Sequence, residues 1–138
     1  MKGQPVVLAT ALLCSLGAYG QTITSSNDRG DGFAAMCRVA VTFENQGYEA
    51  ATEKLGKSPV AAASDIAGCY QYIRGFIEGH NMAADHAPSA KQFCIPDGVN
   101  HIQLARIIVR ASDEYPEIAH LPRETVVEAA LKQAFPCD

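Results

Sequence analysis

Residues 94–111, which read CIPDGVNHIQLARIIVRA, contain the most clearly marked helix start in the chain. Asn100 is a favoured N-cap residue, and Gln103 completes a capping box, in which each side chain bonds the other residue's backbone N–H. Pro116 disfavours helix before it, so we expect this helix to end near Tyr115. Its apolar residues recur at helical spacing, at Leu104, Ile107, Ile108 and Ala111. The stretch therefore predicts an amphipathic helix that packs through one face.

Three further main helices are predicted around this one. The first covers residues 31–47 and ends at a glycine, which suits a helix C-terminus. The second starts at a cap provided by Ser64 or Asp65, and the last covers 122–135 between two prolines. Residues 48–55 could add a short helix. Because no stretch alternates at period two, we predict an all-α fold, a small disulfide-stapled bundle of about four main helices.

Three glycines, Gly68, Gly75 and Gly79, lie within the second predicted helix. Each costs about 1 kcal/mol relative to alanine in a helix interior, so a structural reason for them is expected. Close contact with another helix of the domain is one explanation. A surface for a partner or a second copy, on the side of Gly75 and Gly79, is the other.

The N-terminus has the pattern of a secretory signal peptide. Lys2 supplies the positive charge, and residues 6–16 form an apolar segment that is shorter than the roughly 20 residues a bilayer requires. The small residues Ala18 and Gly20 predict cleavage before Gln21. We therefore expect export to a bacterial periplasm, with a signal peptide at 1–20, a flexible tail at 21–30 and one folded domain at 31–138.

Cys14 lies inside the apolar segment and offers an alternative, the anchor of a lipoprotein. Such a site requires a small residue directly before the cysteine, and Leu13 is not small. We therefore expect Cys14 to be removed with the signal peptide.

Four cysteines remain after cleavage, and an even number of thiols in an exported protein predicts a disulfide framework. Cys94 precedes the third main helix and Cys137 follows the fourth. The short connection at 116–121 makes these helices antiparallel neighbours, so the two cysteines should lie side by side. Cys37 and Cys69 then pair by elimination, although four cysteines allow three pairings. Loop closure stabilises such a chain by about 3.5–4 kcal/mol per bond.

The charge balance limits the partners. The formal net charge is −4, and removing Lys2 makes it −5. Nucleic acids and anionic membranes attract positive charge, so we expect neither as a partner of the mature chain. A basic protein partner is compatible with this charge.

Patterns for catalysis and metal binding are weak. A cysteine nucleophile needs a free thiolate beside a histidine, and cysteines in disulfides provide none. His80, Asp85 and His86 match no strong zinc spacing. The pair Asp113 and Glu114 fits a solvated acidic edge better than acid–base catalysis. We therefore expect no enzyme, no metal and no cofactor.

Three blocks of the sequence resemble a known family. They lie at 69–76 (CYQYIRGF), at 93–99 with 103–106 (FCIPDGV, QLAR) and at 129–137 (AALKQAFPC). Together they are similar to the Rap/Tai family of immunity proteins, which are linked to bacterial type VI secretion. This resemblance implies a small helical periplasmic protein, often a homodimer, that binds a peptidoglycan amidase toxin and blocks its active site. The blocks contain mostly core and cysteine positions, so they imply the fold and not the toxin contact.

A protein that blocks an enzyme needs an element that can enter the catalytic groove, and loops on a rigid scaffold serve this purpose. Residues 80–92 form the longest exposed polar connection between the predicted helices. An ordinary surface loop is the alternative interpretation. The candidate partner contacts in this segment are Asn81, Asp85, His86 and Lys91.

A second class of function also fits the composition. A small helical periplasmic protein can act as an acid-stress chaperone, a holdase that loosens at low pH and exposes apolar surface to clients. The 15 carboxylates and four histidines would supply the acid sensitivity.

Overall fold

Apolar residues at helical spacing produce helices along the whole described chain. The structure, a computed structural model, describes residues 26–137. Within these residues it has no β-strand and a single isolated bridge, between Arg29 and Pro122. The all-α prediction is confirmed, and α1, α3, α4 and α6 are the main helices. In chain order the elements are η1 (Ser26–Asp28), α1 (Gly30–Gln46), α2 (Tyr48–Glu53), α3 (Pro59–His86), η2 (Pro88–Ala90), α4 (His101–Glu114), α5 (Pro116–Ala119) and α6 (Arg123–Ala134).

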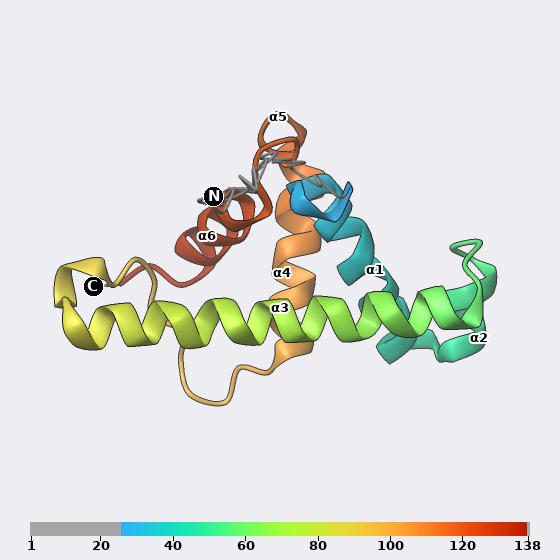
Figure 1. Cartoon of the computed structure of the whole chain (residues 1–138), viewed down its shortest axis with the longest axis horizontal. Coiled ribbons are helices and arrows are strands. Elements are labelled where there is room, and N and C mark those ends of the chain that lie inside the picture. Colours follow the sequence, from blue (N-terminus) through green and yellow to red (C-terminus); the bar gives the residue numbers. More distant parts are fainter. Residues whose placement is uncertain (1–25, 138) are drawn as a thin grey trace, which may run out of the picture.

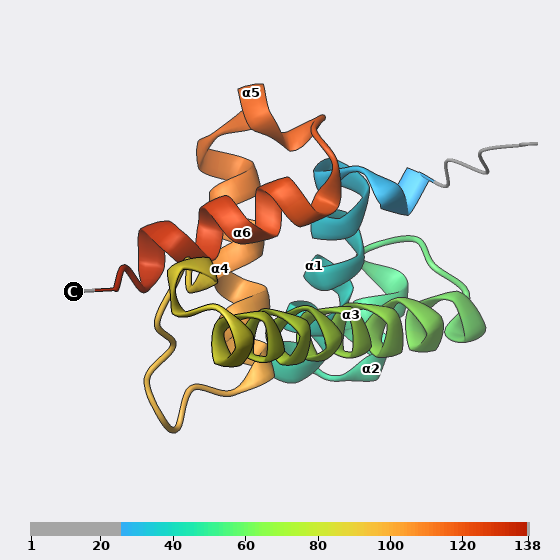
Figure 2. The same ribbon diagram turned by 60° about the vertical axis from the view of Figure 1, so that its left-hand side comes forward.

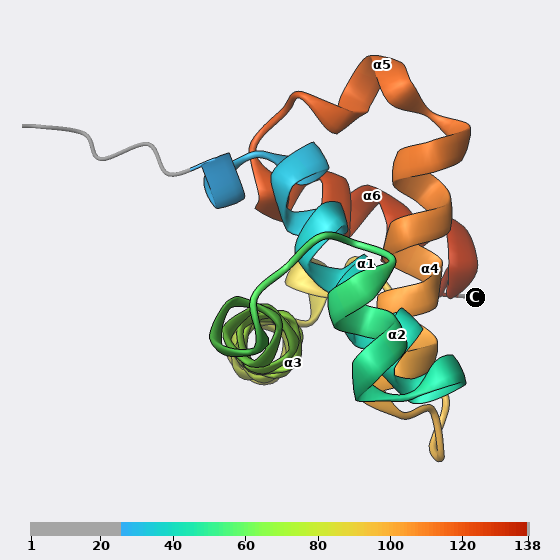
Figure 3. The same cartoon turned by 90° about the vertical axis from the view of Figure 1, so that its right-hand side faces the viewer.

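The bundle is arranged around α1. This helix packs against α3 and α4, and α6 lies across α1 and α4 (Figure 2). The longest helix, α3, crosses the molecule from α2 to η2 (Figure 1). In a view along α3, α1 lies beside it and α4 lies beyond α1 (Figure 3). Only one side of α3 is therefore covered by the bundle, and its other side is exposed.

The core fills the space between the four main helices. Phe33 of α1 and Ile73 of α3 are completely buried, and Phe93, from the segment before α4, is 2% exposed. The ring of Tyr72 packs edge-on against Phe33 with a centroid distance of 4.6 Å. Burial of such side chains supplies most of the favourable free energy of folding. A smaller cluster, made of Val39, Ala51 and Ala62, holds α2 against α1 and α3.

Helix α3 is longer at both ends than the sequence analysis predicted. It begins at Pro59, with Ser58 as the N-cap, whose hydroxyl accepts a hydrogen bond from the Ala61 N–H at 3.3 Å. Proline at the first helical position has a pre-set φ, which favours this start over Ser64 or Asp65. The helix continues to His86, and Pro88 follows. In the described residues neither this helix nor any other is long and apolar enough to cross a membrane.

The predicted tail, 21–30, is too long at its C-terminal end. Ser26–Asp28 form η1, and Gly30 already belongs to α1. The Gly30 N–H donates to the Leu121 carbonyl at 2.9 Å, so the start of α1 is hydrogen-bonded to the segment before α6. A Cβ at position 32 would lie 1.8 Å from the Ser26 carbonyl oxygen. Because Gly32 has no Cβ, η1 can fold back onto α1. Residues 1–25, including the predicted signal peptide at 1–20, lie outside the described residues.

The three glycines of α3 have different surroundings. A Cβ at Gly68 would lie 2.9 Å from the Met36 sulfur, so α1 passes close to α3 at this point. A Cβ at Gly75 or Gly79 would meet nothing within 4 Å. Close packing within the domain therefore explains Gly68 and not the other two.

Two disulfides connect the helices. Cys37 of α1 is joined to Cys69 of α3, and Cys94 is joined to Cys137 after α6. In each pair the Cα atoms are 5.0 Å apart, within the range that a disulfide spans. These are the pairs expected from the order of the helices.

Candidate functional site

The predicted contact residues gather at the C-terminal end of α3, though mostly not in a loop. Asn81, Asp85 and His86 lie on its last turns, and only Lys91 follows η2. The prediction that 80–92 is a loop is therefore wrong for 80–86, because no residue in this stretch breaks the helix before Pro88. All four side chains are exposed, as is Met82 at 64%. We call these five residues the α3-end surface.

Two of the four predicted residues share a hollow. Asn81 and Lys91 line a small cavity of about 120 Å³, together with Ile77, Phe93, Cys94 and Ile95. Asp85 and His86 do not line it. The structure thus brings Asn81 and Lys91 together across 10 residues of sequence, and it leaves the other two on the outside of the same helix end.

The segment that carries Lys91 is anchored on both sides. His80 stacks on the buried ring of Phe93 with a centroid distance of 3.8 Å, and its Nε2 is 3.3 Å from the Phe93 carbonyl oxygen. Because a carbonyl only accepts, this bond requires the tautomer with a proton on Nε2. The Cys94 N–H donates to the Phe135 carbonyl at 2.8 Å. These contacts hold the segment around Phe93 in place beside the α3-end surface.

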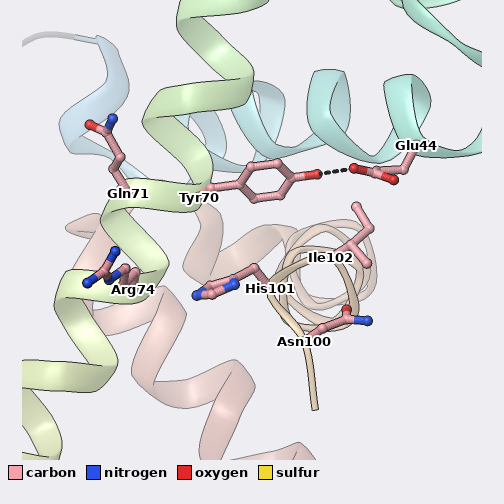
Figure 4. Close-up of a pocket in the computed structure, with 7 residues that line it drawn as sticks. All are labelled: Glu44, Tyr70, Gln71, Arg74, Asn100, His101 and Ile102. Carbon is pink, nitrogen blue, oxygen red and sulfur yellow. Dashed lines mark hydrogen bonds between the residues drawn. The ribbon is translucent and has the colours of Figure 1, made fainter. Parts of the chain in front are cut away.

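A larger hollow of about 500 Å³ lies where the end of α1, the middle of α3 and the start of α4 meet (Figure 4). It is lined by Glu44, Tyr70, Gln71, Arg74, Asn100, His101 and Ile102. Sequence analysis did not identify it, because its residues come from three separate segments without a shared motif. Asn100 was recognised only as a helix cap, and it does cap α4: the Gln103 N–H donates to its side chain at 3.0 Å.

Hydrogen bonds order part of this hollow. The Tyr70 hydroxyl donates to the Glu44 carboxylate at 3.2 Å, as Figure 4 shows. Burial, followed by the negative charge of Glu44, raises the pKa of Tyr70 to about 12, so the phenol stays protonated at neutral pH. The Arg74 Nε donates to Glu78 at 2.8 Å, one turn further along α3. The hollow therefore combines polar groups, among them Glu44, Gln71 and Arg74, with the apolar side chain of Ile102.

The sequence raised two kinds of reactive site, a cysteine nucleophile and a zinc site. The four described cysteines are in disulfides, so none provides a thiolate nucleophile. Among residues 26–137, no group of three or more His, Cys, Asp or Glu side chains is positioned to hold a metal ion. His80, Asp85 and His86, considered above as zinc ligands, do not form such a group.

The fold and these surfaces define a class, a small all-helical domain held by two disulfides and exposing polar surfaces suited to contacts with another protein. The family profile described as Rap1a immunity proteins matches residues 29–137, nearly the whole described chain. The chain therefore belongs to the Rap1a immunity protein family. No curated protein and no solved structure shows significant similarity to it.

Proposed function

We propose that this chain is a periplasmic immunity protein that binds a type VI secreted peptidoglycan amidase and blocks its active site. The observation that carries the proposal is the family match over residues 29–137. Immunity proteins act by binding a toxin, so the partner is another protein. The toxin is proposed to be an amidase because the sequence resembles immunity proteins of that kind.

The proposal places the protein where such a toxin acts. Peptidoglycan lies outside the inner membrane, and the N-terminal pattern at 1–20 would export the chain to that compartment. Disulfides persist in an oxidising compartment, so the two bonds agree with export. N-terminal sequencing of the protein from a periplasmic fraction tests this part, and the first residue should be Gln21.

The α3-end surface is the proposed contact. It combines both charges, in Asp85 and Lys91, with the exposed side chain of Met82. Protein interfaces contain apolar anchors surrounded by a polar rim, and the flexible thioether of methionine adapts to an uneven partner. Most of the surface lies on the long helix α3, whose C-terminal end is held by the stacking of His80 on the buried Phe93. A partner would therefore bind a preorganised surface.

Association with the amidase toxin that is proposed as the partner tests the binding. The mature protein, immobilised, should retain the purified amidase in a pull-down. Charge reversals Asp85→Lys and Lys91→Glu should weaken this association at least about tenfold if both charges face the toxin.

Matched control variants are available at the C-terminal end of α2, near the other end of α3 (Figure 1). Glu53 and Lys54 are likewise one exposed acid and one exposed base. Glu53→Lys and Lys54→Glu should leave the association unchanged. Equal affinity of the Asp85 and Lys91 variants and the wild type would remove the α3-end surface from the proposal and leave the immunity role standing. Failure of the wild type to retain the amidase would count against the function itself.

A further inference from the structure

The two disulfides differ in their access to solvent. Cys37 and Cys69 are both 0% exposed, since they lie on the faces of α1 and α3 that meet in the core. Cys137 is exposed and Cys94 is half-buried. A thiol reagent has to reach a sulfur atom along the axis of the S–S bond, so access controls which bond reacts. Residue exposure therefore favours attack on the outer bond, whereas the inner bond is covered.

We propose that Cys94–Cys137 is a thiol-exchange site, which small thiols and dithiol reductants open while Cys37–Cys69 stays intact. The reagent's thiolate attacks Sγ of Cys137, the S–S bond breaks, and Cys94 leaves as a thiolate that takes a proton from water. A monothiol remains on Cys137 as a mixed disulfide. The second thiolate of a dithiol attacks that mixed disulfide, which releases the Cys137 thiolate and oxidises the reagent to its own disulfide.

The surroundings of Cys94 favour it as the leaving group. Lys91 lines the same hollow as Cys94, and its positive charge stabilises a thiolate there. A more stable thiolate is displaced faster in thiol exchange. On the side of α6, Lys132 donates to Gln92 at 2.9 Å, which brings a second ammonium group close to this segment, although Glu128 at 3.5 Å from the Lys132 Nζ offsets part of its charge. Both cations are exposed, so their effect is largest at low salt.

The fold does not depend on the outer bond alone. Phe93 is buried beside His80, and Leu131 of α6 is completely buried in the core. These contacts remain when the bond opens, so the change is confined to the C-terminal residues and to the segment around Cys94. Because Asn81 and Lys91 border Cys94, opening also loosens the α3-end surface. This last consequence rests on the proposed function, whereas the exchange site itself does not.

Exchange kinetics on the mature, oxidised protein test the site without any toxin. The protein is incubated with reduced glutathione under native conditions, quenched by alkylation at intervals, and mapped by mass spectrometry. Glutathione or alkyl groups should appear on Cys94 and Cys137 at least about tenfold faster than on Cys37 and Cys69, because the inner pair reacts only after an opening of the core. Helical circular dichroism should persist while the outer pair reacts. Equal rates for the two pairs, or faster reaction of the inner pair, would overturn the proposal.

One double variant and one single variant separate exchange from unfolding. Cys94→Ser with Cys137→Ser should retain the helical signal and show faster hydrogen exchange around residues 91–95, while the inner bond keeps its slow reaction. Lys91→Gln should slow the reaction of the outer pair at low salt, with Lys54→Gln, directly after α2, as the matched control. A Cys94→Ser/Cys137→Ser protein that loses its helical signal, or a Lys91→Gln protein that reacts at the wild-type rate, would contradict the proposed mechanism.

Discussion

The start of α4 depends on two side chains that bond each other's backbone. The Asn100 side chain accepts from the Gln103 N–H at 3.0 Å, and the Gln103 side chain accepts from the Asn100 N–H at 2.8 Å. Asn100→Ala removes an acceptor from the first turn and should lower the free energy of unfolding by about 1 kcal/mol in a urea titration. Asp97→Ala, in the exposed loop before the helix, serves as the control. An unchanged midpoint for Asn100→Ala would show that water replaces the cap without loss.

Tyr70 offers a test by titration. Its pKa is raised from 10.0 to about 12, with burial as the largest cause and Glu44 second. Glu44→Gln should therefore lower the pKa of Tyr70 and leave it above the ordinary value, as measured by NMR of the tyrosine Cζ atoms, with Tyr70→Phe to assign the signal. A complete return to about 10 would contradict burial as the main cause.

The same shift has a consequence for stability. The folded state holds the phenolic proton more tightly than the unfolded chain does. The stabilisation from Tyr70 is therefore complete below pH 10.0 and is lost as the pH rises towards about 12. Above this range the phenolate and the Glu44 carboxylate carry like charges and repel each other.

Helix packing can be tested with two glycines in opposite surroundings. A Cβ at Gly30 of α1 would lie 2.3 Å from a Val126 methyl carbon and 2.9 Å from the Ala119 carbonyl oxygen, whereas a Cβ at Gly75 of α3 meets nothing within 4 Å. Gly30→Ala should destabilise the domain by about 1–3 kcal/mol through overpacking. Gly75→Ala should stabilise it by up to about 1 kcal/mol through helix propensity. Thermal unfolding of both variants compares the signs.

A stabilising Gly75→Ala variant would also be informative about function. Retaining an exposed glycine that costs stability suggests that a partner approaches this side of α3, the second explanation offered by the sequence. If Gly75→Ala destabilises the isolated protein instead, the space beside Gly75 is not open, and the structure is contradicted at this point.

At the level of elements, the sequence analysis succeeded where local chemistry decides the structure. The capping box at Asn100 and the prolines after α4 and α6 act within one turn, so α4 and α6 were predicted to within a few residues. Helix α3 was predicted too short at both ends, because Ser58 and Ser64 are both acceptable caps. The choice between them depended on Pro59. At the other end, no residue after Gly79 breaks the helix before Pro88, so α3 continues to His86.

The surfaces were harder to predict than the helices. The residues at the α3 end were chosen from one continuous segment, and the structure does place them at one end of the molecule, though on a helix. The hollow around Tyr70 and Arg74 forms only where α1, α3 and α4 meet, so no local sequence pattern could predict it. The disulfide pairs were easier to predict than the surfaces and harder than the helices, because the order of the helices limits which cysteines can meet.

At the scale of the whole molecule, the helices form a scaffold that is held together by disulfides and a shared core. Two disulfides close loops across 32 and 43 residues, and the core lies between four helices. The chain belongs to the Rap1a immunity protein family, which points to an immunity role. The proposed activity of this scaffold is to bind a toxin and block it.

The most direct test of this claim is a titration of amidase activity. Peptidoglycan cleavage by the amidase proposed as the target is measured while the mature, oxidised protein is added in increasing amounts. We expect the activity to fall in proportion to the added protein and to disappear near equimolar protomers, as for tight binding at the active site. Full activity in the presence of a large molar excess of the folded protein would contradict it.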